Sequence, residues 1–177
     1  MKNILILSTL LMFVSFIALA HDNDSHESDF KVVLNESYSE ECGICHFAYL
    51  PGMLPSKSWK LLLSDLKLKN HFDEEIELDN ATKDQILNYL ISHSADKSNY
   101  KRSKKIMRTI SRDEIPARIS EIRYIKDKHR KIPSKLVTGN SEVESLSNCD
   151  SCHKDAINGI FDDDTVSIPG YGKWDDD

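Results

Sequence analysis

The stretches Cys42-Gly43-Ile44-Cys45-His46 and Cys149-Asp150-Ser151-Cys152-His153 decide what this chain folds around. They contain all four cysteines of the 177 residues, and both follow the pattern Cys-x-x-Cys-His. Two thiols at this spacing lie on one turn of the chain and can add to the two vinyl groups of a single haem, while the adjacent histidine can reach the iron. The pattern therefore predicts two covalently bound c-type haems, held by Cys42, Cys45, His46, Cys149, Cys152 and His153.

Other uses of four cysteines fit this spacing less well. Two structural disulfides are the ordinary expectation in a small exported chain. A four-thiolate zinc site can be built from two Cys-x-x-Cys pairs, but zinc does not require a histidine directly after each pair. A thioredoxin-like dithiol follows an apolar strand of a βαβ unit, and neither pair does. Haem attachment is the interpretation that accounts for both histidines.

The N-terminus has the pattern of a secretory signal peptide. Lys2 is followed by an apolar run from Ile4 to Ala20, which ends in the small-residue pattern Ala18-Leu19-Ala20 and gives way to polar residues at His21. The run is slightly short for a membrane span, so cleavage after Ala20 is favoured over an uncleaved membrane anchor. We therefore expect export across the cytoplasmic membrane and no stable membrane insertion after cleavage.

The mature chain is acidic and has a modest apolar content. Lys2 is the only charged residue in the signal peptide, so after cleavage 22 of the 23 Lys and Arg residues remain against 29 Asp and Glu, a net charge of −7. Such a charge argues against binding to nucleic acid or to an anionic membrane, and it favours a partner with a basic docking surface. A haem would add internal apolar mass to a lean core.

Hydrophobic periodicity predicts a mainly α-helical first half. We expect a short helix from Tyr38 to Phe47, a proline-rich loop over 49–55, and a helix from Trp59 to about Lys69 capped by Ser58. A further helix should start at Asp79 or Asn80 and end near His93. This succession has about the size of a small cytochrome domain.

The second half is expected to be less regular. A basic segment precedes it, with a short helix from Pro116 toward His129, and the chain ends in an acidic stretch. The expected parts are a signal peptide (1–20), a polar leader (21–37), a first haem c domain (38–95), a basic linker with a short helix (96–128), and a second haem c segment with an acidic tail (129–177).

The residue on the far side of each iron decides what the haems can do. His71 lies 25 positions after His46, in a link between two expected helices, and His129 lies 24 positions before His153. Both are placed for the chain to return across a haem face, so we predict His71 and His129 as the sixth ligands. The alternatives are His93, which can instead bond to a carbonyl at the end of its helix, Met53 and Met107.

Histidine on both sides would leave each iron without an open site, which predicts electron transfer as the function. A diheme peroxidase or reductase needs a vacant or displaceable position and a nearby acid–base group, and it would normally use a longer chain. A gas or redox sensor would use loss of His71 or His129 as its switch, but no output domain follows.

The sequence also resembles the soluble bacterial diheme cytochrome c family over nearly the whole mature chain. The resemblance rests on Glu41 to Trp59, Asn70-His71-Phe72, Ile86 to Leu90, Lys128-His129-Arg130, Asn148 to His153, and Phe161-Asp162 through Ile168-Pro169. It implies a periplasmic, bis-histidine electron carrier whose first half is similar to class I cytochromes c and whose second half is largely irregular. It implies redox partners such as a small oxygen-binding c-type haem protein or a membrane cytochrome. It leaves open which distal histidine serves which haem.

Overall fold

The computed structural model describes residues 28–174. The predicted signal peptide, residues 21–27 of the predicted polar leader and the last three acidic residues lie outside this range. Within the described range, no helix is both long and apolar enough to cross a membrane.

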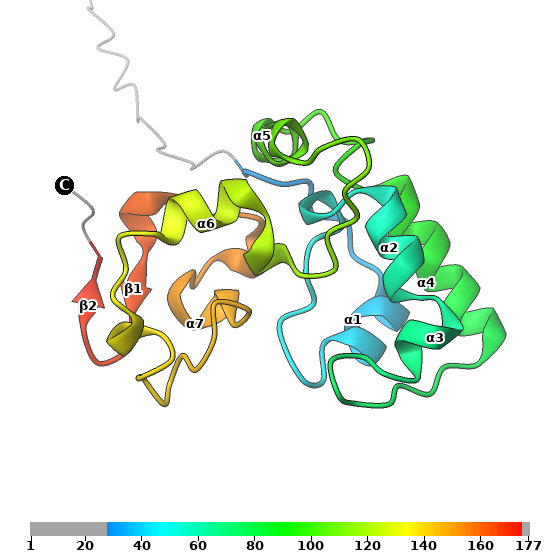
Figure 1. The fold of residues 1–177 in the computed structure, drawn as a ribbon, viewed down its shortest axis with the longest axis horizontal. Helices are drawn as coiled ribbons and strands as arrows, with labels where there is room; N and C mark the ends of the chain where they lie inside the picture. Colours follow the sequence, from blue (N-terminus) through cyan, green and yellow to red (C-terminus); the bar gives the residue numbers. More distant parts are fainter. Residues whose placement is uncertain (1–27, 175–177) are drawn as a thin grey trace, which may run out of the picture.

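The first half of the chain forms a small helical unit around α4. Its elements are α1 (Glu36–Cys42), the 3-10 turn η1 (Pro51–Met53), α2 (Ser56–Leu62), α3 (Asp65–Leu68) and α4 (Asn80–Ser92). Both α1 and α2 pack against α4, on the right of Figure 1. Ile86 and Leu90 of α4 are fully buried, and the Trp59 indole donates to the Pro51 carbonyl at 2.9 Å.

Helix α4 is confirmed at both ends, because its signals are local. The Asp79 carboxylate accepts hydrogen bonds from the backbone N–H groups of Ala81 and Thr82 at 2.9 and 3.1 Å, as an N-cap does. His93 occupies the C-cap position.

Two other expected helices were wrong in extent. The helix expected over 38–47 ends at Cys42, because Gly43 forms its C-cap, and so the second thiol and the histidine follow in a bend. The helix expected from Trp59 to Lys69 is divided into α2 and α3 at Ser64, whose hydroxyl donates to the Leu61 carbonyl at 2.7 Å.

We expected Ser58 to cap α2, but it does not. It lies inside the helix and is fully buried. The helix starts after Pro55, and its first N–H group, that of Ser56, donates to the Asp96 carboxylate at 2.7 Å. The cap thus comes from a residue 40 positions away, which the sequence pattern did not indicate.

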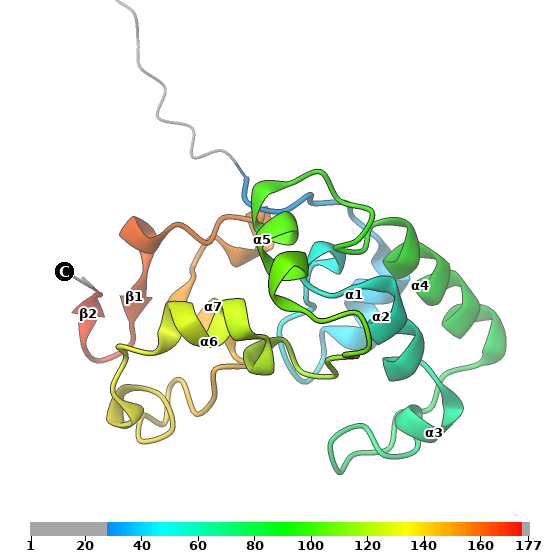
Figure 2. The same cartoon turned by 45° about the horizontal axis from the view of Figure 1, so that its top comes forward.

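The basic segment over 96–128 contains a helix that we did not expect, α5 (Lys101–Thr109). It packs against η1 and α6, and Figures 1 and 2 both show it above the junction of the two halves. Ile106 and Ser103 are fully buried, and the Ser103 hydroxyl donates to the Gly52 carbonyl at 2.8 Å. A Cβ at Gly52 would lie 2.8 Å from that hydroxyl, so the close approach requires glycine there.

The second half is largely irregular, as expected, and the mainly α-helical fold class is confirmed. Its elements are η2 (Ile119–Glu121), α6 (Arg123–His129), η3 (Ser134–Leu136), α7 (Cys149–Cys152), η4 (Ala156–Asn158), η5 (Asp163–Thr165), β1 (Ser167–Ile168) and β2 (Gly172–Lys173). The expected helix toward His129 is α6, which begins only at Arg123. β1 and β2 pair antiparallel, with Ser167 opposite Lys173 and Ile168 opposite Gly172.

The main core joins the two halves. Phe30, Ile106, Ile122 and Phe161 belong to the same buried cluster as α2 and α4, and the Phe30 and Phe161 rings meet edge to face at 5.4 Å. The backbone N–H groups of Asp29 and Phe30 donate to the Gly159 carbonyl at 2.9 and 3.3 Å. The N-terminal end of the described chain is therefore fastened to the second half. A smaller cluster beyond it consists of Val137, Val143, Val166 and Ile168.

Candidate functional site

The structure brings the four candidate axial histidines together in two pairs. The ring centres of His46 and His71 are 6.4 Å apart, and those of His129 and His153 are 6.2 Å apart. A metal–imidazole bond is about 2.0–2.1 Å long and the ring centre lies about 1.1 Å beyond the nitrogen, so two imidazoles on opposite sides of one metal have centres roughly 6.2–6.4 Å apart. Both pairs have the separation that a shared iron requires.

The two pairs differ in the angle between their rings. The His46 and His71 planes are nearly parallel, at 19°, whereas the His129 and His153 planes are close to perpendicular, at 75°. Each pair joins an attachment histidine to the candidate nearest to it along the chain. The sequence left open the crossed pairs, His46 with His129 and His153 with His71. The structure does not bring those pairs together.

His46 is held in the bend that follows α1. Its Nδ1–H group donates to the Phe47 carbonyl at 2.8 Å, which leaves Nε2 free for a metal. The Tyr49 ring stacks on the imidazole, with centres 4.9 Å apart and planes at 26°. Both contacts restrict rotation of the ring.

His71 is presented by a tight turn between α3 and α4. The backbone N–H group of His71 donates to the Glu74 carbonyl at 2.7 Å, and Phe72 and Asp73 take positive φ values of 57° and 80°. The Phe72 ring meets the imidazole edge to face, with the Arg118 guanidinium 3.8 Å above the centre of the Phe72 ring. An element from outside the first half thus supports this turn.

His129 and His153 come from α6 and from the end of α7. The Nδ1–H group of His129 donates to the Ile125 carbonyl at 2.8 Å, which orients the ring from its own helix. The backbone N–H group of His153 donates to the Cys149 carbonyl at 2.8 Å. The His153 ring packs against the Phe161 ring, with centres 5.1 Å apart.

Burial keeps two of these imidazoles neutral. It lowers the pKa of His153 to about 4, with a further contribution from His129, and it lowers the pKa of His71, with a further contribution from His46. A neutral imidazole is the form that binds a metal. The Nδ1 atoms of His71 and His153 are buried without a hydrogen-bond partner in the described chain, so these two rings are oriented by packing.

None of the four cysteines forms a disulfide. The alternative of two disulfides is therefore not the arrangement found. Among residues 28–174, no three or more His, Cys, Asp or Glu side chains converge in the way that a zinc site needs.

The second attachment motif opens into a pocket that fits a haem. Cys149, Cys152, His129 and His153 all line it. Most of its other walls are apolar, and they come from both halves of the chain: Phe30, Met53, Ile119, Ile125, Ile132, Leu136, Val137, Val143, Phe161, Val166, Ile168 and Trp174. A flat apolar ring with thiols and imidazoles at its edge and faces is what this lining suits.

A second hollow lies beside the first attachment motif. Cys45 and His46 border it together with Asn148, which precedes the second motif, and Asp150 and Ser151 within that motif, so the two attachment segments are neighbours in space. His71, whose ring centre is 6.4 Å from that of His46, does not line this hollow.

Of the three other ligand candidates, His93 and Met107 line neither hollow, whereas Met53 lines the second haem pocket. The Nδ1–H group of His93 donates to the Tyr89 carbonyl at 2.9 Å, the terminal-carbonyl bond that we had weighed for it. Met53 is buried in the wall of the second haem pocket, and Met107 is half-buried on α5. His71 and His129 as ligands stay predictions, and their positions agree with them.

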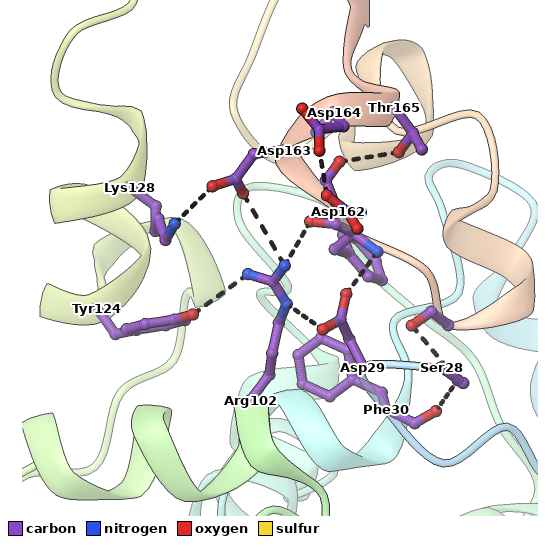
Figure 3. Close-up of polar contacts among 12 residues, drawn as sticks. Ser28, Asp29, Phe30, Arg102, Tyr124, Lys128, Asp162, Asp163, Asp164 and Thr165 are labelled. Atoms are coloured by element: carbon purple, nitrogen blue, oxygen red, sulfur yellow. Dashed lines mark hydrogen bonds and ion pairs between the residues drawn. The ribbon is translucent and has the colours of Figure 1, made fainter. Parts of the chain in front are cut away.

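Arg102 of α5 is the centre of a polar network beside the second haem pocket (Figure 3). Its Nε lies 2.6 Å from the Asp29 carboxylate, and its terminal nitrogens donate to the Phe161 carbonyl at 2.8 Å and the Tyr124 hydroxyl at 3.2 Å. Asp163, 3.9 Å from the same guanidinium, also pairs with Lys128 at 2.7 Å.

This network ties together the segments that carry the second histidine pair. Lys128 precedes His129 on α6, and Phe161 packs against His153. Our sequence analysis treated Arg102 only as one residue of the basic segment, and it assigned no role to Asp29 or Tyr49. Only the position of Tyr49 close to the first motif could have drawn attention to it.

Comparison with known proteins agrees with the geometry. Residues 38–161 match the family model for dihaem cytochrome c. The chain belongs to the dihaem cytochrome c family. The chain is similar to the crystal structure of a dihaem cytochrome c from Shewanella baltica OS155, with 36% identity, a TM-score of 0.64, and coverage of 80% of this chain and 98% of the other.

It is also similar to a dihaem cytochrome c from Rhodobacter sphaeroides, with 37% identity, a TM-score of 0.64, and coverage of 73% of this chain and 98% of the other. No curated protein matches it.

Family membership establishes the cofactor and the general role. This dihaem cytochrome binds two covalently attached c-type haems, and it is a haem-based electron carrier. The predicted cofactors and the suspected family are thereby confirmed.

Proposed function

We propose that this dihaem cytochrome carries electrons in the periplasm through two bis-histidine haems. His46 and His71 would hold the first iron, and His129 and His153 the second. The observation that carries the proposal is the ring-centre separation of 6.4 and 6.2 Å in the two pairs, which suits one metal between each.

Two oriented imidazoles would leave neither iron open to a small molecule. A bound haem supplies a centre that gains and loses one electron without a change in its ligands. The chain orients each imidazole, through the Phe47 carbonyl, the Ile125 carbonyl and the packing around His71 and His153. Electron transfer, rather than turnover of a bound substrate, follows from that arrangement.

The periplasmic location rests on the leader sequence, whose apolar run and small-residue ending favour export and cleavage after Ala20. The partners would be other redox proteins, with a small oxygen-binding c-type haem protein and a membrane cytochrome as the candidates. A net charge of −7 favours a partner that presents a basic surface, and the association should weaken as salt is added.

Paramagnetic resonance and carbon monoxide test the ligand set. In low-spin iron between two imidazoles, near-parallel rings give an ordinary rhombic signal, and near-perpendicular rings give a highly anisotropic one. We expect one signal of each kind from the oxidised protein, because the ring angles are 19° and 75°. Neither reduced haem should bind carbon monoxide. A high-spin haem that binds it would refute the ligand set at that site and would favour an enzyme or a sensor.

A further inference from the structure

The side chain of Tyr49 contacts both haem-attachment segments. Its ring stacks on the His46 imidazole, with centres 4.9 Å apart and planes at 26°. Its hydroxyl donates to the Ser147 carbonyl at 2.8 Å, across 98 positions of sequence. Ser147 is two residues before Cys149, the first thiol of the second motif. One side chain therefore connects an axial ligand of the first haem to the backbone that anchors the second.

Tyr49 is itself held rigidly. The Tyr49 carbonyl accepts a hydrogen bond from the Tyr38 hydroxyl at 2.7 Å. The Phe47 ring meets the Tyr49 ring edge to face, with centres 5.9 Å apart. Leu50 and Pro51, which follow it, are buried. A ring fixed at both ends can transmit a defined spacing, because few rotamers remain open to it.

The phenol lies close to the second motif, because its hydroxyl reaches the Ser147 carbonyl. A phenol with an ordinary pKa of about 10 keeps its proton at neutral pH and can donate this bond. The hollow that Cys45 and Ser151 both border also shows that the segments are neighbours.

We propose that Tyr49 is a positioning residue that couples the two haem sites. Its stacked ring sets the rotation of the His46 imidazole, and its hydrogen bond sets the distance from the first site to the second attachment segment. Electron exchange between the haems, in which one iron is oxidised as the other is reduced and the phenol keeps its proton, depends on that spacing. The proposal rests on the proposed bis-histidine carrier.

Two substitutions separate the two contacts. Tyr49→Phe keeps the ring on His46 and removes the bond to Ser147, whereas Tyr49→Leu removes both. Tyr89→Phe is the matched control, because the Tyr89 hydroxyl also donates to a carbonyl, that of Val33, at 2.7 Å, but this bond joins no segment of the second motif. All variants are prepared as the mature protein with both haems attached.

Two measurements decide the question: the paramagnetic resonance spectrum, and the rate of electron exchange between the haems after partial photoreduction. Tyr49→Phe should slow the exchange and leave both low-spin signals in place. Tyr49→Leu should slow it further and shift the rhombic signal of the first haem. Tyr89→Phe should change neither the exchange rate nor the signals.

Wild-type exchange in Tyr49→Phe, or an unchanged first-haem signal in Tyr49→Leu, would overturn the proposal. If Tyr49→Leu does not mature, the exchange rate of Tyr49→Phe decides alone. A wild-type protein without two low-spin signals would instead refute the proposed function, so the two failures are distinguishable.

Discussion

Replacing Arg102 with glutamine should destabilise the protein near its second haem. The Arg102 side chain is 16% exposed and that of its partner Asp29 is 21% exposed. Breaking a fully buried ion pair costs about 3–5 kcal/mol, and an exposed pair contributes about 0–1 kcal/mol. The pair lies between these limits, and the guanidinium also donates to Phe161 and Tyr124. We expect Arg102→Gln to lower the free energy of unfolding by about 2–4 kcal/mol.

The matched control for this substitution is Arg108→Gln, because Arg108 is an exposed arginine on the same helix. An exposed substitution of this kind should change the free energy of unfolding by about 0.5 kcal/mol or less. Arg102→Lys should recover only part of the loss, because an ammonium group cannot reproduce the planar fork that reaches three partners at once.

Denaturant unfolding of the mature protein with both haems measures the effect. Loss of secondary structure gives the free energy, and paramagnetic resonance of the two low-spin haems locates the damage. The highly anisotropic signal of the second haem should change, because the network joins α6 to the chain around His153, while the rhombic signal of the first haem should persist. If Arg102→Gln costs no more than Arg108→Gln, the network is not the structural centre that we describe.

Three further predictions test other parts of the molecule. His129→Ala should open the second haem to carbon monoxide, whereas His93→Ala should leave both haems closed to it; absorption spectra of the reduced variants decide between them. Asp79→Asn should keep the α4 cap and flatten the acid side of the stability–pH curve. The reason is that hydrogen bonding to Thr82 and the backbone lowers the pKa of Asp79. The stability that the Asp79 carboxylate contributes is therefore full above its unfolded-state pKa of about 3.9 and is lost as the pH falls through its folded-state pKa. Unfolding measured over an acid pH series checks this prediction. Ile106→Ala should cost about 2–5 kcal/mol, since the side chain is fully buried, and an unchanged denaturation midpoint would mean that α5 is not part of the core.

Several features with local causes were predicted well from the sequence. The two covalently bound haems follow from the spacing within two five-residue motifs, and Asp79 caps α4 through hydrogen bonds to residues two and three positions away. The end of α4 at His93 and the irregular second half also follow from local composition. Some errors arose where a distant residue took part, as at α2, whose first N–H group is capped by Asp96. Others were local, because Gly43 ends α1 and Ser64 separates α2 from α3.

What the sequence by itself determined is the chemistry: the cofactor, its thioether attachment, two attachment histidines and a short list of candidates for the opposite ligands. Only the tertiary structure decided which histidines face each other and at what angle, that α5 closes the core through Ile106, and that Arg102 and Tyr49 join the two halves. The reason is physical. Haem attachment and helix caps need atoms from neighbouring residues, whereas ring angles, buried ion pairs and core contacts come from segments as far apart as 132 positions, which only the folded chain brings together.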